Sequence, residues 1–185
     1  MRTIAIPVFA GLVCTGAFWL FMVNPTAVPA VNAPDVVDRQ APEFVEITEW
    51  LNEKPLKMAD LKKSVVVVHF WTNGCINCVH NYPHYRKWME QFKDHRDFRM
   101  VGVHTPEFDG EKSISRLKDR IRDNKLTFAV AVDNSGATWK AWGNEYWPCV
   151  YLVDKSGKVR EKWNGELGDK GSAAMTARIE ALLKE

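Results

Sequence analysis

The chain has 185 residues and a formal net charge of +2, from 25 lysines and arginines and 23 aspartates and glutamates. This near-balance argues against a nucleic-acid-binding protein, which usually carries a clear basic excess. Only four cysteines occur, and a framework of structural disulfides would need more cysteines in a smaller chain.

The first segment is apolar. Residues 4–23 contain no charged side chain and follow Arg2. About 20 apolar residues span a bilayer as a helix, and the positive charge of Arg2 is expected to stay in the cytoplasm. We therefore predict a single-pass anchor over residues 1–23 in the inner (cytoplasmic) membrane, with the rest of the chain on the periplasmic side. The alternative is a cleaved signal peptide and a soluble periplasmic protein.

Residues 24–41 are predicted to form a flexible tether, because prolines and small residues recur there without a helical period. The domain proper is expected over residues 42–185. Its first part, residues 43–56, alternates loosely between apolar and polar side chains and is expected to form an N-terminal hairpin extension.

Apolar runs in the sequence predict the strands. Residues 65–70 are a continuous β-branched and aromatic run, which is typical of a central strand buried on both faces. Shorter apolar runs predict strands over residues 99–104 and 128–132. Residues 150–153 and 159–163 flank a Lys-Ser-Gly turn and are predicted to form a hairpin.

Helices are predicted between these strands. The first begins after Cys75 and contains Pro83, which should kink it. The second has apolar residues three and four apart over residues 114–121. A short helix is expected over residues 135–142, and the last should start at a Ser172 cap. The order predicts an α/β fold in which parallel βαβ units precede an antiparallel pair.

Cys75 and Cys78 form a CxxC motif where the central strand passes into the first helix. The free N–H groups and the dipole of a helix start stabilise a thiolate, which is the nucleophilic form of cysteine. We predict that the pair is a redox-active disulfide in which Cys75 attacks and Cys78 resolves. A structural zinc site needs four ligands, and there is no second CxxC, so no metal is expected.

The segments around this motif resemble the redoxin domain of DipZ-type and TlpA-like proteins. Three blocks carry the resemblance, in order, over roughly residues 42–165: Phe70–Cys78 with Pro83, Gly102–Phe108 with Glu111-Lys112, and Asp133-Asn134 followed by Trp139, Asn144, Tyr146-Trp147-Pro148 and Tyr151–Asp154. The resemblance implies a thioredoxin fold, a central mixed sheet flanked by helices, with Pro148 as a cis-proline that faces the CxxC.

The resemblance also implies the activity. We expect an exported thiol–disulfide oxidoreductase that acts, as a reductase, on protein disulfide substrates and needs no cofactor. A transmembrane thiol protein would supply its electrons, and cytochrome c maturation is one pathway that uses such proteins.

Two other functions are alternatives. Thr72 precedes Cys75 at the spacing found in peroxiredoxins, although Val68 stands where those enzymes carry a proline, so a thiol peroxidase is one. A copper-binding chaperone that uses the two cysteines and a nearby histidine is the other.

Several side chains are expected to border the CxxC. We predict that an extended substrate strand is held by Trp71, Asn73, Trp147 and Pro148, with Tyr146 beside them. The alternative for Trp71 is a role mainly in packing. Each of the other candidates, His69, Cys149 and the pair His80 and His84, has two possible interpretations. His69, six residues before Cys75 where relatives have an aspartate, is either the proton acceptor for Cys78 or a core histidine.

Cys149 is either a third redox thiol or a buried core residue. His80 and His84, one helical turn apart, form either a metal site or an exposed polar face. Glu107 is a candidate acid at the edge of the site.

Overall fold

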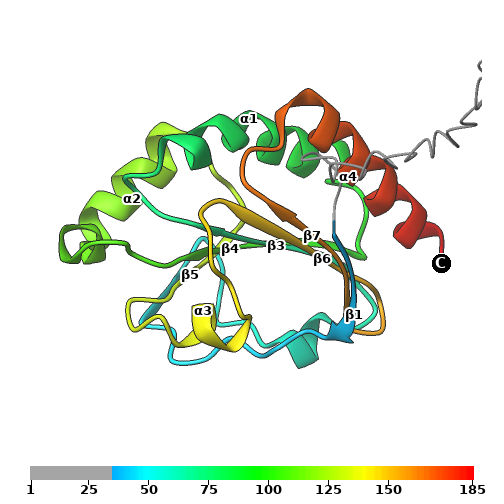
Figure 1. Cartoon of the computed structure of the whole chain (residues 1–185), viewed down its shortest axis with the longest axis horizontal. Coiled ribbons are helices and arrows are strands. Elements are labelled where there is room, and N and C mark those ends of the chain that lie inside the picture. The colour runs from blue at the N-terminus through cyan, green and yellow to red at the C-terminus, as the bar shows by residue number, and fades with distance from the viewer. Residues whose placement is uncertain (1–34) are drawn as a thin grey trace, which may run out of the picture.

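The computed structural model describes residues 35–185, so the predicted anchor and most of the tether lie outside the described residues. Among residues 35–185, no helix is both long enough and apolar enough to span a bilayer. These residues form a seven-stranded mixed sheet with the strand order β1-β7-β6-β3-β4-β5-β2. Helices α1, α2 and α4 cover one face of the sheet, and α3 lies on the other (Figure 1).

The strands are β1 (Asp35–Gln40), β2 (Glu49–Leu51), β3 (Val65–Trp71), β4 (Phe98–His104), β5 (Ala129–Val132), β6 (Cys149–Val153) and β7 (Lys158–Asn164). The α-helices are α1 (Ile76–Gln91), α2 (Ile114–Asp123), α3 (Ala137–Ala141) and α4 (Gly168–Lys184). Two short 3-10 helices, η1 (Met58–Leu61) and η2 (Asp109–Lys112), lie in the connections.

Strand β3 is the centre of the sheet. It pairs in parallel with β4 and antiparallel with β6, and all of its residues are buried. Val67 and Trp71 point into the core below α1, α2 and α4, whereas Val68 and Phe70 point into the core on the α3 side. The run of β-branched residues is therefore explained by burial on both faces, and the predicted thioredoxin-like arrangement is confirmed.

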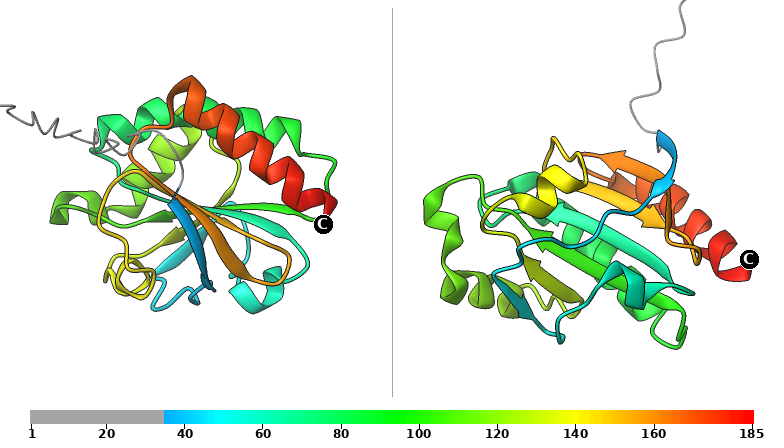
Figure 2. Two further views of the ribbon diagram at one scale, coloured as in Figure 1. Left: turned by 45° about the vertical axis from the view of Figure 1, so that its right-hand side comes forward. Right: turned by 90° about the horizontal axis from the view of Figure 1, so that it is seen from below.

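The predicted N-terminal hairpin is wrong. Strand β1 pairs with β7 at one edge of the sheet, and β2 pairs with β5 at the other edge. The chain between them crosses the α3 face of the sheet (Figure 2). Phe44 packs there against Trp50 and Trp142, with ring centroids 5.4 and 6.3 Å apart. The apolar spacing that indicated a hairpin therefore reflects contacts with the sheet.

The predicted tether is too long at its C-terminal end. Residues 35–40, which were predicted to belong to it, form strand β1 and are part of the sheet. Their sequence is mostly polar, as suits an edge strand held by backbone pairing. The last helix starts at Gly168 rather than at a Ser172 cap, and Ser172 is buried within it. The N–H of Leu167, just before the helix, donates to the Asn81 side chain of α1 at 2.8 Å.

Candidate active site at the start of helix α1

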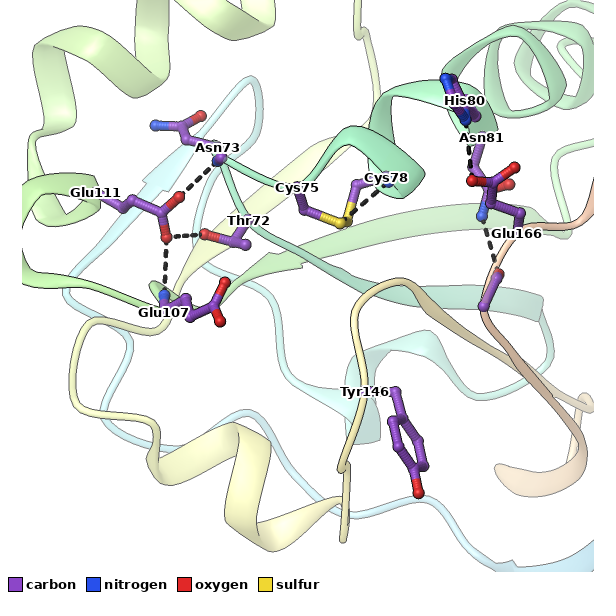
Figure 3. Close-up of a disulfide and its surroundings, with 12 residues drawn as sticks. Thr72, Asn73, Cys75, Cys78, His80, Asn81, Glu107, Glu111, Tyr146 and Glu166 are labelled. Atoms are coloured by element: carbon purple, nitrogen blue, oxygen red, sulfur yellow. Dashed lines mark hydrogen bonds and ion pairs between the residues drawn. A yellow bond between two sulfur atoms is a disulfide. The ribbon is translucent and has the colours of Figure 1, made fainter.

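The CxxC lies where β3 passes into α1. Cys75 is the N-cap of α1, and the two cysteines form a disulfide within its first turn (Figure 3). The backbone N–H of Cys78 donates to the sulfur of Cys75 at 3.1 Å. Cys75 is half-buried and Cys78 is fully buried. The sulfur that faces solvent is thus also the one that receives a hydrogen bond from the helix start, which stabilises it as a thiolate when the pair is reduced.

The turn before Cys75 is tied to a carboxylate. Glu111 of η2 accepts hydrogen bonds from the Thr72 hydroxyl, from the Gly74 N–H at 2.5 Å and from the Glu107 N–H at 2.8 Å (Figure 3). Burial acts to raise the pKa of Glu111, but the hydrogen bonds from Thr72 and the backbone outweigh it and lower that pKa. Glu111 is therefore held as an ionised clamp between the turn and the segment after β4.

The acidic side chain that contacts the turn before Cys75 is Glu111, not the predicted Glu107. The Glu107 side chain is exposed, and among the described residues only its backbone N–H is bonded to the clamp. Nothing in the local sequence pattern indicates the bond from Thr72 to a residue 39 positions away. The one signal for Glu111 is that it lies in a block shared with the redoxin domains.

The Trp147–Pro148 peptide bond is cis, as predicted. The Pro148 carbonyl accepts from the Gly165 N–H at 2.8 Å, and the half-buried Trp147 ring packs on Trp139 with centroids 4.1 Å apart. Tyr146, just before them, is 56% exposed. Its ring points away from the disulfide (Figure 3).

Trp71 does not offer a surface to a substrate, contrary to the prediction. It is fully buried between the rings of Tyr82 and His104, at 5.8 and 5.2 Å. Its position in β3 explains this, because side chains of that parity point into the core below α1. Asn73 is half-buried, and its backbone carbonyl accepts from Arg120 at 3.3 Å.

His69 is fully buried between the rings of Tyr85 and Phe128, at 4.2 and 4.7 Å. Neither ring nitrogen has a hydrogen-bond partner within residues 35–185, and burial lowers its pKa to about 3. A ring with so low a pKa is a weak proton acceptor, which favours the interpretation as a core histidine. His104 is a second such ring, because burial, partly opposed by Glu111, lowers its pKa to about 4.

The remaining candidates are Cys149, His80 and His84. Cys149 is a buried thiol that donates to Asn164 at 3.3 Å, and burial raises its pKa to about 12. The imidazole of His80 lies 2.9 Å from the Glu166 carboxylate, and burial lowers the pKa of His84. In the part of the chain that the structure describes, no three histidine, cysteine or acidic side chains are grouped as metal ligands.

Asn81, three residues after Cys78, was missed by the sequence analysis. It is fully buried and its amide oxygen accepts from the Leu167 N–H, while its amide nitrogen donates to Tyr85 at 3.2 Å and to the Gly165 carbonyl at 3.4 Å. Each of these bonds joins α1 to itself or to the loop that follows β7. Asn81 therefore fixes the helix that carries the CxxC against the next layer of the fold.

Comparison with known proteins identifies the family to which the chain belongs. The AhpC/TSA family model matches residues 37–162. DipZ of Mycobacterium bovis is 38% identical over 129 residues, which are 68% of this chain and 18% of that protein. The thiol-disulfide oxidoreductase YkuV of Bacillus subtilis is 25% identical over 144 residues, 78% of this chain and 94% of YkuV.

A solved structure, a thiol-disulfide isomerase from Corynebacterium glutamicum, superimposes with a TM-score of 0.67 at 28% identity, over 78% of this chain and 97% of that one. The chain belongs to the AhpC/TSA family, and the resemblance to DipZ-type redoxins is confirmed. It spans less than a fifth of the length of DipZ.

The two buried histidines make stability depend on pH. Their pKa values are lower in the folded chain than the 6.5 expected when unfolded, so the unfolded chain binds more protons below pH 6.5. This part of the stability is fully present well above pH 6.5, and it is lost as the pH falls to about 3 for His69 and about 4 for His104. We expect a loss of about 1.5 kcal/mol per histidine between pH 6.5 and 5, measured by urea unfolding.

In that measurement His69→Leu should flatten the dependence, whereas His95→Gln should not, because His95 is exposed. An equal slope in the native chain and in His69→Leu would contradict the assignment of a neutral, buried His69.

Glu111→Gln tests the clamp. The amide keeps one acceptor oxygen but loses the charge that strengthens three hydrogen bonds. We expect the free energy of unfolding at pH 7 to fall by about 1–3 kcal/mol. Glu107→Gln is the matched control, since its carboxylate makes no hydrogen bond within residues 35–185, and it should change stability by less than about 0.5 kcal/mol.

Proposed function

We propose that this AhpC/TSA-family chain is a thiol–disulfide oxidoreductase that reduces disulfides of protein substrates through Cys75 and Cys78. The observation that carries the proposal is the disulfide in the first turn of α1, in which the sulfur of the half-buried Cys75 accepts from the Cys78 N–H. The activity named for the relative YkuV, which this chain matches over nearly its whole length, supports it.

The reaction starts from the reduced pair. The Cys75 thiolate attacks one sulfur of the substrate disulfide, a mixed disulfide forms, and the other substrate sulfur leaves as a thiolate that takes a proton from water. Cys78 then loses its proton and attacks the Cys75 sulfur. The second substrate sulfur leaves, and Cys75 and Cys78 end as a disulfide. Two electrons pass to the substrate in each cycle.

The two thiols have different tasks because their surroundings differ. Cys75 is reachable from solvent and is stabilised as a thiolate by the helix start, so it attacks an external disulfide. Cys78 is fully buried and is bonded to the sulfur of Cys75, so it resolves the mixed disulfide. Cys149 takes no part, because burial keeps its thiol protonated.

The substrate strand is proposed to lie across Asn73, Trp147 and Pro148. An extended chain placed there gains apolar contact from the half-buried Trp147 and lies over the buried Pro148. The exposed ring of Tyr146 extends that surface at one end.

Reduction of insulin by the full chain, with dithiothreitol as the electron source, tests the activity. We expect Cys75→Ala to abolish turnover, because the attacking sulfur is lost. Cys78→Ala should accumulate a mixed disulfide that mass spectrometry detects. Cys149→Ala is the control and should keep nearly full activity.

Two results would contradict the proposal in favour of another function. Consumption of hydrogen peroxide without insulin reduction would indicate a thiol peroxidase. Stoichiometric copper in protein purified under reducing conditions, lost in the Cys75→Ala variant, would indicate a copper chaperone.

We further propose that residues 1–23 anchor the chain in the cytoplasmic membrane, with the redoxin domain on the outer side. The uncharged run after Arg2 supports this orientation. A transmembrane thiol protein would then reduce the Cys75–Cys78 pair again, and cytochrome c maturation is a pathway in which such electrons are used.

Fusion of alkaline phosphatase after residue 41 tests the location. Because that enzyme is active only outside the cytoplasm, we expect an active fusion that stays with membranes after carbonate extraction. A fusion released by extraction, with its N-terminus removed, would support signal cleavage instead. An inactive fusion would contradict export.

A further inference from the structure

The first residue that the structure describes, Asp35, lies at the same end of the sheet as the active site. Strand β3 ends at Trp71 and leads to Cys75, and β6 begins at Cys149, directly after the cis-proline. Strand β7 runs antiparallel to β6, so it finishes at this end of the sheet, which we call the site end. Strand β1 runs antiparallel to β7, so it starts toward the site end.

The pairing of the strands shows how far Asp35 lies from the strand that carries the CxxC. Asp35 is level with Lys162 of β7. Lys162 is level with Tyr151 of β6, which in turn is level with Val68 of β3. Three spacings between neighbouring strands therefore separate Asp35 from β3, a distance of about 14 Å.

Hydrogen bonds join the start of β1 to the region of the cis-proline. Asn164, at the end of β7, donates to the Asp35 carboxylate at 3.4 Å and accepts from the Cys149 thiol at 3.3 Å. The N–H of the next residue, Gly165, donates to the Pro148 carbonyl at 2.8 Å. The place where the chain enters the sheet is thus held close to the cis-proline.

The C-terminus lies at the other end of the sheet. Helix α4 begins at Gly168, shortly after β7 finishes at the site end, and its 17 residues extend about 25 Å. Near its last turn, the Leu183 carbonyl accepts from Lys155 at 2.8 Å. Lys155 belongs to the turn between β6 and β7, which is at the end of the sheet opposite the CxxC, and the C-terminus lies on the same side (Figure 1).

Exposed apolar side chains gather at the site end. Four large apolar side chains are exposed in the part of the chain that the structure describes, and three of them lie here. Ile76 is the first residue of α1, Phe108 follows β4, which is parallel to β3, and Tyr146 precedes the cis-proline. Apolar side chains held in water around a reactive disulfide are typical of a contact surface for another polypeptide.

We propose that the site end of the domain faces the membrane, and that Cys75 exchanges disulfides with a protein embedded in that membrane whose cysteines lie at its outer surface. The proposal rests on the proposed reductase function and on the proposed anchor, and it adds the place where the partner is met. Residues 24–34 separate the anchor from β1, and 11 residues span at most about 40 Å. Because they join the fold at the site end, this end is held closer to the membrane than the far end.

Confinement next to the membrane determines which disulfides react fastest. Two groups held on one membrane meet at an effective concentration that depends on the length and the attachment point of the linker. With the anchor joined to β1, Cys75 is near the attachment point. With an anchor joined to the C-terminus, about 25 Å of protein would lie between the attachment point and the site.

A disulfide carried on a lipid tests the proposal. A phospholipid head group is linked through a disulfide to nitrothiobenzoate, and the same head group without acyl chains is the soluble probe. Cys75 attacks the head-group sulfur and releases the coloured thiolate, and Cys78 then attacks Cys75 and releases the head-group thiol. The full chain with Cys14→Ser, which removes the thiol of the anchor, is reconstituted in phosphatidylcholine vesicles, reduced and freed of reductant.

A matched variant carries the same segments at the far end. It begins at Asp35 and continues after Glu185 with residues 24–34 and then residues 4–23. For each chain, the rate with the lipid-linked probe is divided by the rate with the soluble probe. We expect this ratio to be about fivefold higher in the native arrangement than in the far-end variant. Insertion of about 40 glycine and serine residues after residue 34 should lower the native ratio, because a longer linker dilutes the site.

The outcomes separate the three proposals. Equal ratios in the native and far-end arrangements would overturn the membrane-facing site and leave the reductase function intact. If the far-end variant does not fold, which a slow reaction with the soluble probe would reveal, the inserted linker decides, and an unchanged ratio would overturn the proposal. A chain that does not float with the vesicles would reject the anchor and this proposal together. Failure of the native chain to reduce the soluble probe and insulin would reject the reductase function itself.

Discussion

The hydrogen bond from the Cys78 N–H to the Cys75 sulfur is the contact on which the site depends. It forms because Cys75 is the N-cap of α1, where the Cys78 N–H is shared between the Cys75 sulfur and the Cys75 carbonyl, each at 3.1 Å. The buried strand β3 sets the position of the helix start, since its pairing with β4 and β6 leaves the strand no freedom to move. The core of the fold therefore fixes where one sulfur meets solvent.

The carboxylate of Glu111 gives the turn before Cys75 its shape. Burial of part of a charged group is unfavourable, and three hydrogen bonds offset that cost. The same bonds keep the carboxylate ionised. One residue thus holds the turn before Cys75 against the segment that follows β4.

The buried polar groups under the site, unlike Glu111, are uncharged. His69 and His104 have no hydrogen-bond partners among residues 35–185, and burial keeps both rings neutral. They add polar atoms to the core without adding charge. A neutral His69 adds no charge below the site, whereas the helix start donates a hydrogen bond to the Cys75 sulfur.

The sequence alone determined the strand that leads to the CxxC, the helix that follows it and the cis bond before Pro148, because each has a local signal: a β-branched run, a motif or an X-Pro step. Only the tertiary structure decided what depends on residues far apart in the chain.

Three features depend on such distant residues: the placement of β1 and β2 at opposite edges of the sheet, the hydrogen bond from Thr72 to Glu111, and the burial of Trp71. Backbone pairing at a sheet edge needs no apolar period, and a carboxylate brought close by folding leaves no pattern in the sequence that could reveal its partner.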